Sequence, residues 1–480
     1  MRWSRLLSGA VPMAAAPAPC AAVARRFAAI VACFAAVAVL FAAVPVSAQQ
    51  QDLPPGVMLE TRYSKAGRQT LAVRPFEALG APSSATADIA GIVRNDLTLS
   101  DRFQMTVVPQ QLATGDIDYT QWNGLNIVWL VAGSVTPSAS GFHVSVSLHD
   151  VVYANVRQTQ TFSLPDTSHS DFRMAVHTLS DQIVRWISNQ PGMAATRVTF
   201  VRQNTGGTYD LMVVDSDGEN LRRISGSASL VYSPAWSPDG TRIAYTVHLE
   251  EGGWRLIERD MATGATRTLR NATGEEQILT PCYIPNTENI AYASWAGSTM
   301  QVFAFDGSQA RALTEGRAEN LSPSFSRDGQ RFAFHSSRTG RQHIYAARAD
   351  GRNAVAVTPF GESVEYYSPD WQPTGTRLVF HGASRGTFQI MMADAARPGG
   401  QIQQLTSRGR NEDPSWAADG RHIVYTSQPT LSAGTASLYV IDTVTGEIRL
   451  LVSGGAGAKL RLAAWSPSLA GTVNTVQTHD

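Results

Sequence analysis

Residues 233–245 read Ser-Pro-Ala-Trp-Ser-Pro-Asp-Gly-Thr-Arg-Ile-Ala-Tyr. This stretch begins a strand at a proline, places Trp236 two residues later, turns through Asp239-Gly240, and continues into an alternating segment. Alternation of apolar and polar residues is typical of a half-buried strand, and Asp-Gly is a frequent hairpin dipeptide. The stretch therefore predicts a β-hairpin with an aromatic anchor.

Five related copies follow along the chain, and they are recognised by their aromatic anchors. The six anchors are Trp236, Tyr283, Phe325, Trp371, Trp416 and Trp465, spaced 47, 42, 46, 45 and 49 residues apart. A period of roughly 40–50 residues in a sequence of short strands is typical of propeller blades.

A second repeating unit, a trailing pair of strands, lies between the anchored copies. Its first strands are expected at residues 209–214, 254–258, 301–305, 343–347, 388–392 and 438–441. Anchored and trailing pairs together make six four-stranded blades over residues 196–476. The region opens with a lone strand at 197–201 and closes with the anchored strand around Trp465, so the first blade should take its inner strand from the C-terminal end. Such closure hides strand edges, and the sequence predicts an all-β six-bladed propeller.

The turns distinguish the two faces of this predicted ring. The Asp-Gly pairs that begin at Asp217, Asp239, Asp306, Asp328, Asp350 and Asp419 fall between strands one and two or between strands three and four, so they share one face. The opposite face carries the longer connections 249–253, 336–341 and 428–437, and the segments that precede each anchor. Because loops on a rigid scaffold carry binding, partners are expected on this second face.

The segments before the anchors are acidic. They contain Glu275, Glu276, Glu319, Glu365, Glu412 and Asp413. These residues should ring the mouth of the central channel. They form either a negatively charged socket for a partner loop or a cation, or simply solvated loop acids; the sequence leaves both readings open.

An α+β domain is expected before the propeller, over residues 70–190. A buried strand at 70–76 precedes a helix at 84–99, and a second helix spans 170–189 before Pro191-Gly192. His169 and His177 belong to this second helix or its start, and a solvated or packing role is expected for both. The preceding segment, 49–69, is expected to be flexible.

Residues 1–48 read as a cleaved export signal. Arginines precede an apolar run, and Val46-Ser47-Ala48 offers a small-residue cleavage site. The alternative is a membrane anchor. Since Cys20 and Cys33 lie in this signal, Cys282 is left alone in the mature chain, where it is expected to be a buried structural thiol and no disulfide is expected.

The sequence shows no catalytic, metal-binding or nucleic-acid-binding signature. Gly382-Ala383-Ser384-Arg385-Gly386 matches a nucleophile pattern but precedes a blade strand, so it predicts a blade hairpin. The histidines of the propeller are expected to be core or surface residues; they are His248, His335, His343, His381 and His422. The formal net charge is zero, and no clustered basic face for nucleic acid is indicated. No catalytic residue, metal or cofactor is predicted.

The order of these parts resembles the TolB family, periplasmic proteins of the Tol-Pal envelope system. The resemblance covers nearly all of the mature chain. It is carried by residues 71–76 (Leu-Ala-Val-Arg-Pro-Phe), by residues 209–218 (Tyr-Asp-Leu-Met-Val-Val-Asp-Ser-Asp-Gly), by the repeats, which are of the WD40-like or PD40 type, and by the closing Ala464-Trp465-Ser466-Pro467.

The resemblance implies a non-enzymatic, monomeric, periplasmic scaffold without a stable membrane anchor, which supports outer-membrane integrity and constriction at division. Its propeller channel would receive the lipoprotein Pal, and its N-terminal segment would engage the C-terminal domain of TolA in a manner coupled to Pal binding. The Pal contacts carried onto this chain are Tyr232, Ser233, Glu276, Gln277, Thr280, Glu319, Asn320, Leu321, Ser322, Tyr366, Tyr367, Glu412 and Asp413. The TolA contacts are Val57, Met58, Leu59, Glu60, Thr61 and Arg62, a segment that suits pairing by strand addition.

Two other functions stay open at this stage. An exported propeller that binds a glycan or a small ligand would need an aromatic-lined pocket, for which Tyr232, Tyr366 and Tyr367 are candidates. A propeller lyase or a peptidase-associated propeller would need convergent histidine and acid residues in the channel, or a catalytic domain.

Overall fold

The computed structural model of the chain describes residues 57–59, 67–225, 230–249, 252–360, 364–384, 386–430, 434–455 and 457–471, with the backbone alone at 57–59 and 384. The predicted signal at 1–48, most of the segment 49–69 and residues 472–480 lie outside this set. All of the described residues belong to one compact unit. Among the described residues, no helix has the length and apolar character needed to cross a membrane.

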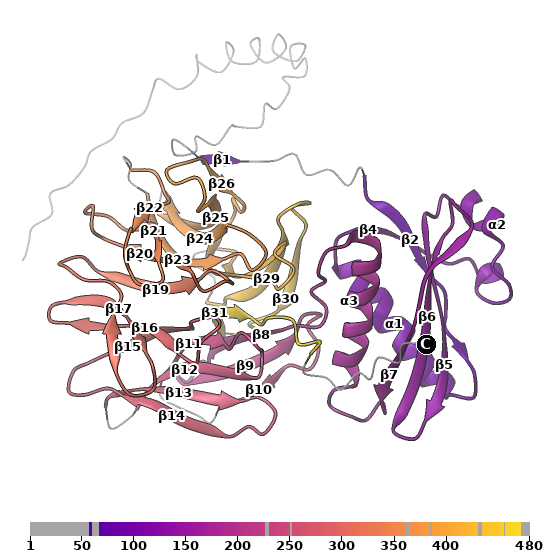
Figure 1. Cartoon of the computed structure of the whole chain (residues 1–480), viewed down its shortest axis with the longest axis horizontal. Coiled ribbons are helices and arrows are strands. Elements are labelled where there is room, and N and C mark those ends of the chain that lie inside the picture. Colours follow the sequence, from indigo (N-terminus) through magenta and orange to yellow (C-terminus); the bar gives the residue numbers. More distant parts are fainter. Residues whose placement is uncertain are drawn as a thin grey trace, which may run out of the picture. The chain divides into compact units, whose positions relative to one another are not determined.

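The first domain is α+β, as predicted (Figure 1). Its sheet has the order β4-β2-β5-β6-β7, with β3 paired to β5. Strand β2 is parallel to both β4 and β5, whereas β5, β6 and β7 are antiparallel. The elements are β2 (Gln69–Val73), β3 (Glu77–Ala78), α1 (Ser83–Leu99), β4 (Phe103–Thr106), the 3-10 turn η1 (Gln110–Leu112), α2 (Tyr119–Gly124), β5 (Trp129–Ser138), β6 (Gly141–Asp150), β7 (Asn155–Pro165) and α3 (Phe172–Ser188).

Helices α1 and α3 pack their apolar stripes against one face of this sheet. Ile89, Val93 and Leu97 of α1 share a core with Val176 and Leu179 of α3, at the 3.6-residue spacing that the sequence predicted. Helix α3 ends at Ser188, and the next residue, Asn189, adopts a left-handed conformation with φ 52°. Asparagine tolerates this conformation better than most residues, so the helix stops just before Pro191.

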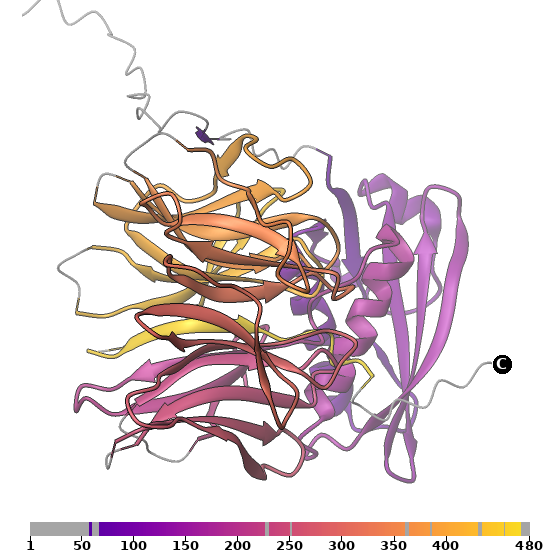
Figure 2. The ribbon, with the colours of Figure 1, turned by 60° about the vertical axis from the view of Figure 1, so that its left-hand side comes forward.

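The second domain is a closed ring of six sheets, here numbered blades 1 to 6, to each of which the propeller contributes four strands. Figure 2 shows these sheets in colours from magenta to yellow. Blade 1 consists of β31 (Lys459–Trp465), β8 (Arg197–Gln203), β9 (Tyr209–Asp215) and β10 (Arg222–Arg223). Blade 2 consists of β11 (Leu230–Trp236), β12 (Arg242–His248), β13 (Trp254–Asp260) and β14 (Thr266–Asn271). Blade 3 consists of β15 (Ile278–Tyr283), β16 (Ile290–Ala296), β17 (Thr299–Phe305) and β18 (Ala310–Ala312).

The remaining blades follow the same order from the inner strand outward. Blade 4 consists of β19 (Asn320–Phe325), β20 (Arg331–Ser336), β21 (His343–Arg348) and β22 (Val355–Ala356). Blade 5 consists of β23 (Glu365–Trp371), β24 (Arg377–Ser384), β25 (Thr387–Asp394) and β26 (Ile402–Gln404). Blade 6 consists of β27 (Arg410–Trp416), β28 (His422–Gln428), β29 (Ser437–Asp442) and β30 (Ile448–Val452).

The predicted closure of the ring is confirmed. Strand β31, from the C-terminal end, pairs antiparallel with β8 and supplies the inner strand of blade 1. The Asp-Gly turns also lie where they were expected, and their glycines have positive φ, for example 72° at Gly240 and 64° at Gly420. We call the side of the ring that carries these turns the turn face, and the opposite side, which carries the segments before the inner strands, the channel face.

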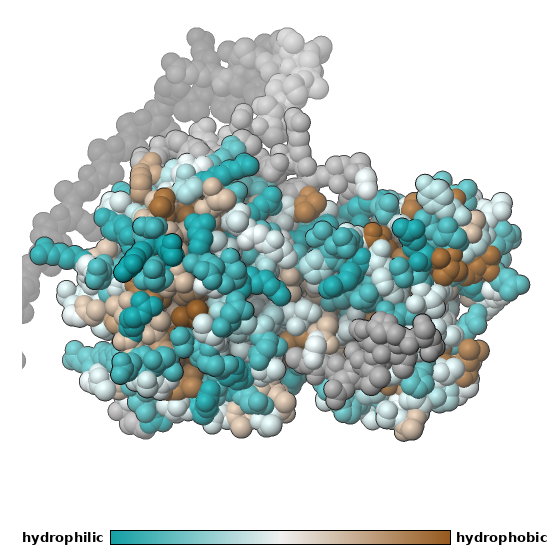
Figure 3. All heavy atoms as spheres, in the orientation of Figure 1, coloured by the Kyte–Doolittle hydropathy of each residue, from teal (hydrophilic) through white to brown (hydrophobic). Residues whose placement is uncertain are grey.

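One strand precedes the first domain. Residues Val57–Leu59 form β1, which pairs in parallel with β26 and so adds a fifth strand to the outer edge of blade 5 (Figure 1). On the face of the molecule seen in Figure 3, hydrophilic residues cover most of the surface and hydrophobic residues are scattered among them.

Candidate functional site

The candidate site is the central channel, which holds a cavity of about 470 Å³. All six inner strands line it, and each is interrupted at the same place by a shift in pairing register. At that place each strand has one non-glycine residue with φ between 46° and 54°: Ser233, Thr280, Ser322, Ser368, Asp413 and Leu462. A proline follows five of the six. Because proline has no N–H to donate and side chains disfavour positive φ, the strand bulges here, and we call these six the bulge residues.

Side chains of the preceding blade hold several of the bulge residues. The backbone N–H of Ser368 donates to His335 Nδ1 at 3.5 Å, and that of Asp413 donates to His381 Nδ1 at 3.3 Å. Burial lowers the pKa of both histidines to about 3, so each ring is neutral and can accept a hydrogen bond at Nδ1. These two histidines were predicted to be core or surface residues, and the structure shows that they also join adjacent blades.

The same connection uses oxygen atoms elsewhere in the ring. The N–H of Ser322 donates to Thr280 Oγ1 at 3.2 Å, and the N–H of Leu462 donates to Asp413 Oδ2 at 3.3 Å. Burial and the neighbouring Glu412 carboxylate raise the pKa of Asp413 to about 6. Blade-to-blade hydrogen bonds therefore fix the shape of the channel wall at the bulge residues.

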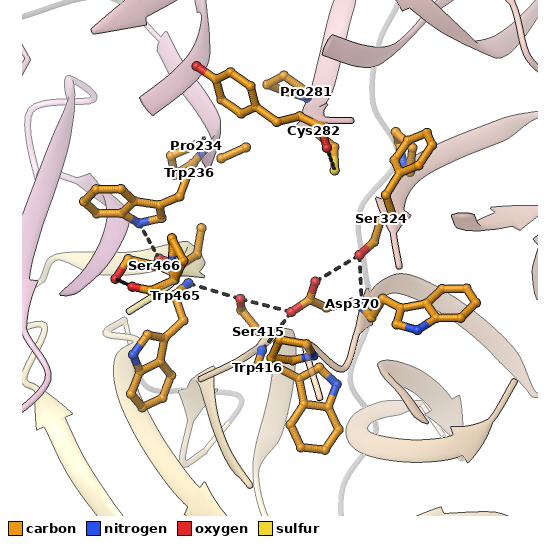
Figure 4. A pocket seen from close by; sticks show the side chains of 18 of the residues that line it. Pro234, Trp236, Pro281, Cys282, Ser324, Asp370, Ser415, Trp416, Trp465 and Ser466 are labelled. Atoms are coloured by element: carbon orange, nitrogen blue, oxygen red, sulfur yellow. Dashed lines mark hydrogen bonds between the residues drawn. The ribbon is translucent and has the colours of Figure 1, made fainter. Parts of the chain in front are cut away.

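A second set of contacts lies two residues further along the inner strands, around Asp370 (Figure 4). Its carboxylate accepts from the hydroxyl of Ser324 at 3.0 Å, from the hydroxyl of Ser415 at 3.2 Å and from the N–H of Trp416 at 2.7 Å. Ser415 Oγ in turn accepts from the N–H of Trp465 at 3.1 Å. Burial raises the pKa of Asp370 above its ordinary value, and its oxygens are used in holding three successive blades together.

Cys282 occupies the corresponding position of blade 3. It lines the cavity and is the free cysteine of the described residues. Burial raises the pKa of its thiol to about 12. The thiol therefore stays protonated at neutral pH and is a poor nucleophile, in agreement with the structural role predicted for it.

The aromatic anchors line the cavity but present little surface to it. Trp236 is 9% exposed, and the other five anchors are less exposed still. Their rings pack between blades, so they do not form the open aromatic platform that a glycan-binding propeller would need.

The predicted contact residues divide into three groups. The first lines the cavity and consists of Ser233, Thr280, Ser322 and Asp413. The second lies partly or fully exposed in the segments around it and consists of Tyr232, Gln277, Glu319, Leu321 and Tyr367. The third is committed to internal contacts and consists of Glu276, Asn320, Tyr366 and Glu412.

Burial and pairing explain the third group. Asn320 is fully buried and donates to Gln301 Oε1 at 2.7 Å, while Tyr366 is 3% exposed and packs in the core between blades 4 and 5. Glu412 accepts two hydrogen bonds from Arg410. The predicted acidic socket is therefore partly neutralised by the chain itself.

Glu276 is neutralised in the same way. Although burial opposes its charge, hydrogen bonds from Arg270, Thr273 N–H and Ser294 hold the pKa of Glu276 below its ordinary value. Glu319 is different, because its side chain is exposed at the channel face.

The predicted TolA segment is described only in part. Val57, Met58 and Leu59 pair with Ile402, Gln403 and Gln404 of β26, and residues 60–62 lie outside the described set. The Gly382–Gly386 motif lies at the turn between β24 and β25, where Ser384 pairs with Thr387. This confirms the predicted blade hairpin.

Sequence reasoning named His177 and His422 but missed the aspartates that surround them. Each histidine is 0% exposed and lies beside two aspartates, at least one of which comes from a distant part of the chain. The interpretation of His177 as solvated or packed assumed that it had no partner at a useful spacing, and its partners are Asp96 and Asp217. One signal was present: Asp96 is the charged residue in the otherwise uncharged buried stripe of α1.

The architecture defines a class: six-bladed propellers preceded by an α+β domain. Family comparison is in agreement, since residues 59–156 match the TolB amino-terminal domain and residues 184–469 match the TolB beta propeller domain. The chain belongs to the TolB family.

Individual relatives support this assignment. The chain is 32% identical over 216 residues to the Tol-Pal system protein TolB of Mannheimia succiniciproducens, and 31% identical over 219 residues to that of Haemophilus influenzae strain Rd. Each alignment covers 43% of this chain and 49% of the relative, so the chain spans about half the length of these relatives. The fold is similar to the crystal structure of TolB from Acinetobacter baumannii, with a TM-score of 0.71 and 22% identity over 85% of this chain and 98% of that one.

Proposed function

We propose that this protein is a non-enzymatic, periplasmic scaffold of the Tol-Pal system that binds Pal at the channel face and TolA through its N-terminal segment. In this role it would support outer-membrane integrity and constriction at division. The observation that carries the proposal is the presence of both TolB family domains, in order, in one chain.

The geometry of the channel favours protein binding over catalysis. The acids that line it, Asp370 and Asp413, accept hydrogen bonds from the wall. The buried histidines His335 and His381 are neutral and accept backbone N–H groups. General acid–base chemistry needs a group that is free to exchange a proton with a substrate. A rigid ring with exposed segments above it is instead suited to receiving a loop of a partner.

The proposed Pal surface is centred on four residues of the channel face. They are Thr280, Glu319, Ser322 and Tyr367, of which the tyrosine stacks on His381 with ring centroids 5.6 Å apart. Tyr367 also donates its hydroxyl to Glu365 at 2.9 Å. A partly buried tyrosine fixed in this way is a rigid amphipathic contact of the kind enriched at interaction hot spots.

Calorimetric titration with the soluble domain of the Pal-like lipoprotein from the same organism tests this surface. We expect Tyr367→Ala and Glu319→Ala together to weaken binding at least tenfold, equivalent to about 1.4 kcal/mol. The matched control is Arg348→Ala with Asp350→Ala, an exposed pair on the turn face of blade 4. Equal affinity for the wild type, the channel-face variant and the control would remove this surface from the proposal, and absence of any binding would remove Pal as the partner.

The proposed TolA contact uses a segment that already pairs as a strand. Since β1 adds in parallel to the edge of β26, TolA would take the same segment by strand addition in competition with blade 5. Removing residues 57–62 should abolish binding of the TolA C-terminal domain and leave Pal binding intact. Retained TolA binding by the shortened chain would contradict this assignment.

A further inference from the structure

A layer of charged side chains lies between the α+β domain and the turn face of the propeller. Residues of the α+β domain and its adjoining loop meet residues of blades 1 and 6 there. We call this layer the junction; its members are Asp96, Asp101, Arg102, Arg173, His177, Asp217, Asp419, Arg421, His422 and Asp442. Apolar contact continues beside it, where Met174 of α3 packs with Ala195 and Leu469.

His177 connects the two domains at one end of the junction. It projects from α3, and its Nδ1 lies 2.8 Å from Asp96 Oδ2 of α1. Its Nε2 faces Asp217 Oδ2, in the turn between β9 and β10 of blade 1, at 3.7 Å. Both ring nitrogens therefore face a carboxylate, one from each domain.

His422 makes the reverse connection at the other end. It projects from β28 of blade 6, and its Nδ1 lies 2.7 Å from Asp419 Oδ2 in the same blade. Its Nε2 faces Asp101 Oδ2, just after α1, at 3.4 Å. An imidazole with carboxylate oxygens at both nitrogens is best satisfied when both nitrogens carry a proton, because a neutral ring donates from only one.

The remaining charges of the junction favour a proton over a metal ion as the bridging species. Arg173 already forms an ion pair with Asp217 beside His177. Asp215 and Asp181 also interact electrostatically with His177, and Asp215 is itself paired with Arg197. A metal ion among these carboxylates would lie against a guanidinium that is already in place.

The same holds around His422. Arg421 binds Asp442 through two nitrogens and donates to the Asp101 carbonyl at 2.8 Å, while Arg102 lies 3.5 Å from Asp419. These arginines compensate the aspartates that surround the imidazole. Burial disfavours charge on either histidine, but the aspartates outweigh it and raise the pKa of His177 to about 9 and the pKa of His422 in the same direction.

We propose that His177 and His422 are bridges that carry a positive charge at neutral pH and lock the α+β domain onto the turn face of the propeller. The lock depends on one proton at each end of the junction. Losing both protons would leave opposed carboxylates of the two domains without their shared cation, so the domains would separate or reorient as the protons leave. This inference does not depend on which partner the channel face binds.

Nitrogen NMR of the full-length mature protein, labelled with ¹⁵N only in histidine, tests the proton directly. The signals of the two bridges are assigned by their loss in His177→Gln and His422→Gln. At pH 7.5 we expect both rings to show two protonated nitrogens, while His335 and His381 show the neutral pattern and serve as internal references. A neutral ring at either His177 or His422, or stoichiometric zinc by elemental analysis of the purified protein, would overturn the proposal.

Scanning calorimetry tests the lock. In the double variant His177→Gln with His422→Gln, the midpoint temperature of the first unfolding transition should fall by more than about 4 °C. This transition should also become separate from the unfolding of the propeller. The control, His143→Gln with His169→Gln, removes two exposed histidines of the α+β domain and should leave the unfolding profile of the wild type unchanged. If the bridge variant does not fold, the wild-type protein scanned at pH 7.5 and pH 10 replaces it, and an unchanged profile at pH 10 would contradict the lock.

Discussion

The channel wall and the junction both bury histidines, and the two regions treat them in opposite ways. His335 and His381 in the channel wall accept backbone N–H groups, and burial without an opposing charge lowers the pKa of each to about 3. His177 and His422 in the junction lie between aspartates, which raise the pKa of each above its ordinary value. Burial alone therefore does not determine the charge of a histidine; the partner at each ring nitrogen does.

The difference follows from how each region is built. The channel wall repeats one strand design six times, so its polar side chains meet N–H groups of the neighbouring copy. The junction joins two unrelated surfaces, and its polar groups must satisfy one another. Neutral histidines are suited to positions where the backbone supplies the donor, and charged histidines to positions where carboxylates supply the acceptors.

The largest expected effect comes from removing one carboxylate of the junction. Asp96→Asn leaves His177 with Asp217, which is already shared with Arg173. Loss of one partner of a buried ion pair costs about 3 kcal/mol, so the free energy of unfolding measured in urea at pH 7 should fall by about that amount. Asp88→Asn, an exposed position on the same helix, should change it by less than about 0.5 kcal/mol. Equal effects of the two substitutions on the free energy of unfolding would show that the charge on His177 does not contribute to stability.

The next effect is the response of the junction to alkaline pH. Because the folded pKa of His177 lies at about 9 and the unfolded value at about 6.5, its stabilisation is complete below pH 6.5. It is lost as pH rises through 9. Each unit of difference in pKa corresponds to about 1.4 kcal/mol, which gives a loss of about 3 kcal/mol over this range. Urea unfolding between pH 6 and 10 measures it, and a His177→Gln variant with the same alkaline slope as the wild type would refute the assignment.

The contrast between the regions also separates what the sequence could predict from what it could not. The spacing of Trp236 and the later anchors, together with the unpaired strand at 197–201, was sufficient for six blades and for closure by β31. These features are local and repeat, so several copies support each inference. The Asp-Gly turns were assigned to one face for the same reason.

The junction could not be predicted because its partners are far apart in sequence and occur only once. Asp96 and His177 are 81 residues apart, and Arg421 and Asp101 are 320 residues apart. No periodicity connects such pairs, and only the docking of two domains brings them together. Among the proposed contact residues, Tyr366 and Tyr367 illustrate the same limit: successive side chains of a strand point to opposite faces, and only the structure shows that Tyr366 is the buried one.

The smallest effect is expected in the channel wall at acid pH. The folded pKa of His381 is about 3, below the unfolded value, so its contribution to stability is present above pH 6.5 and is lost as pH falls toward 3. Between pH 6.5 and 5, each such histidine lowers the free energy of unfolding by at most about 2 kcal/mol. His381→Asn places an amide oxygen near the N–H of Asp413, and the amide does not titrate. The free energy of unfolding of this variant should therefore depend less on pH than that of the wild type over this interval.

The measurement is urea unfolding between pH 6.5 and 5, and the titration of Asp413 must be separated from that of His381. The pKa of Asp413 is raised to about 6 by burial and by Glu412, so this carboxylate takes up a proton over part of the same interval and opposes the effect of His381. The double variant His381→Asn with Asp413→Asn isolates the histidine when it is compared with Asp413→Asn alone. If these two proteins lose stability equally between pH 6.5 and 5, then His381 is protonated in the folded state, and the two kinds of buried histidine are not distinguished by their partners.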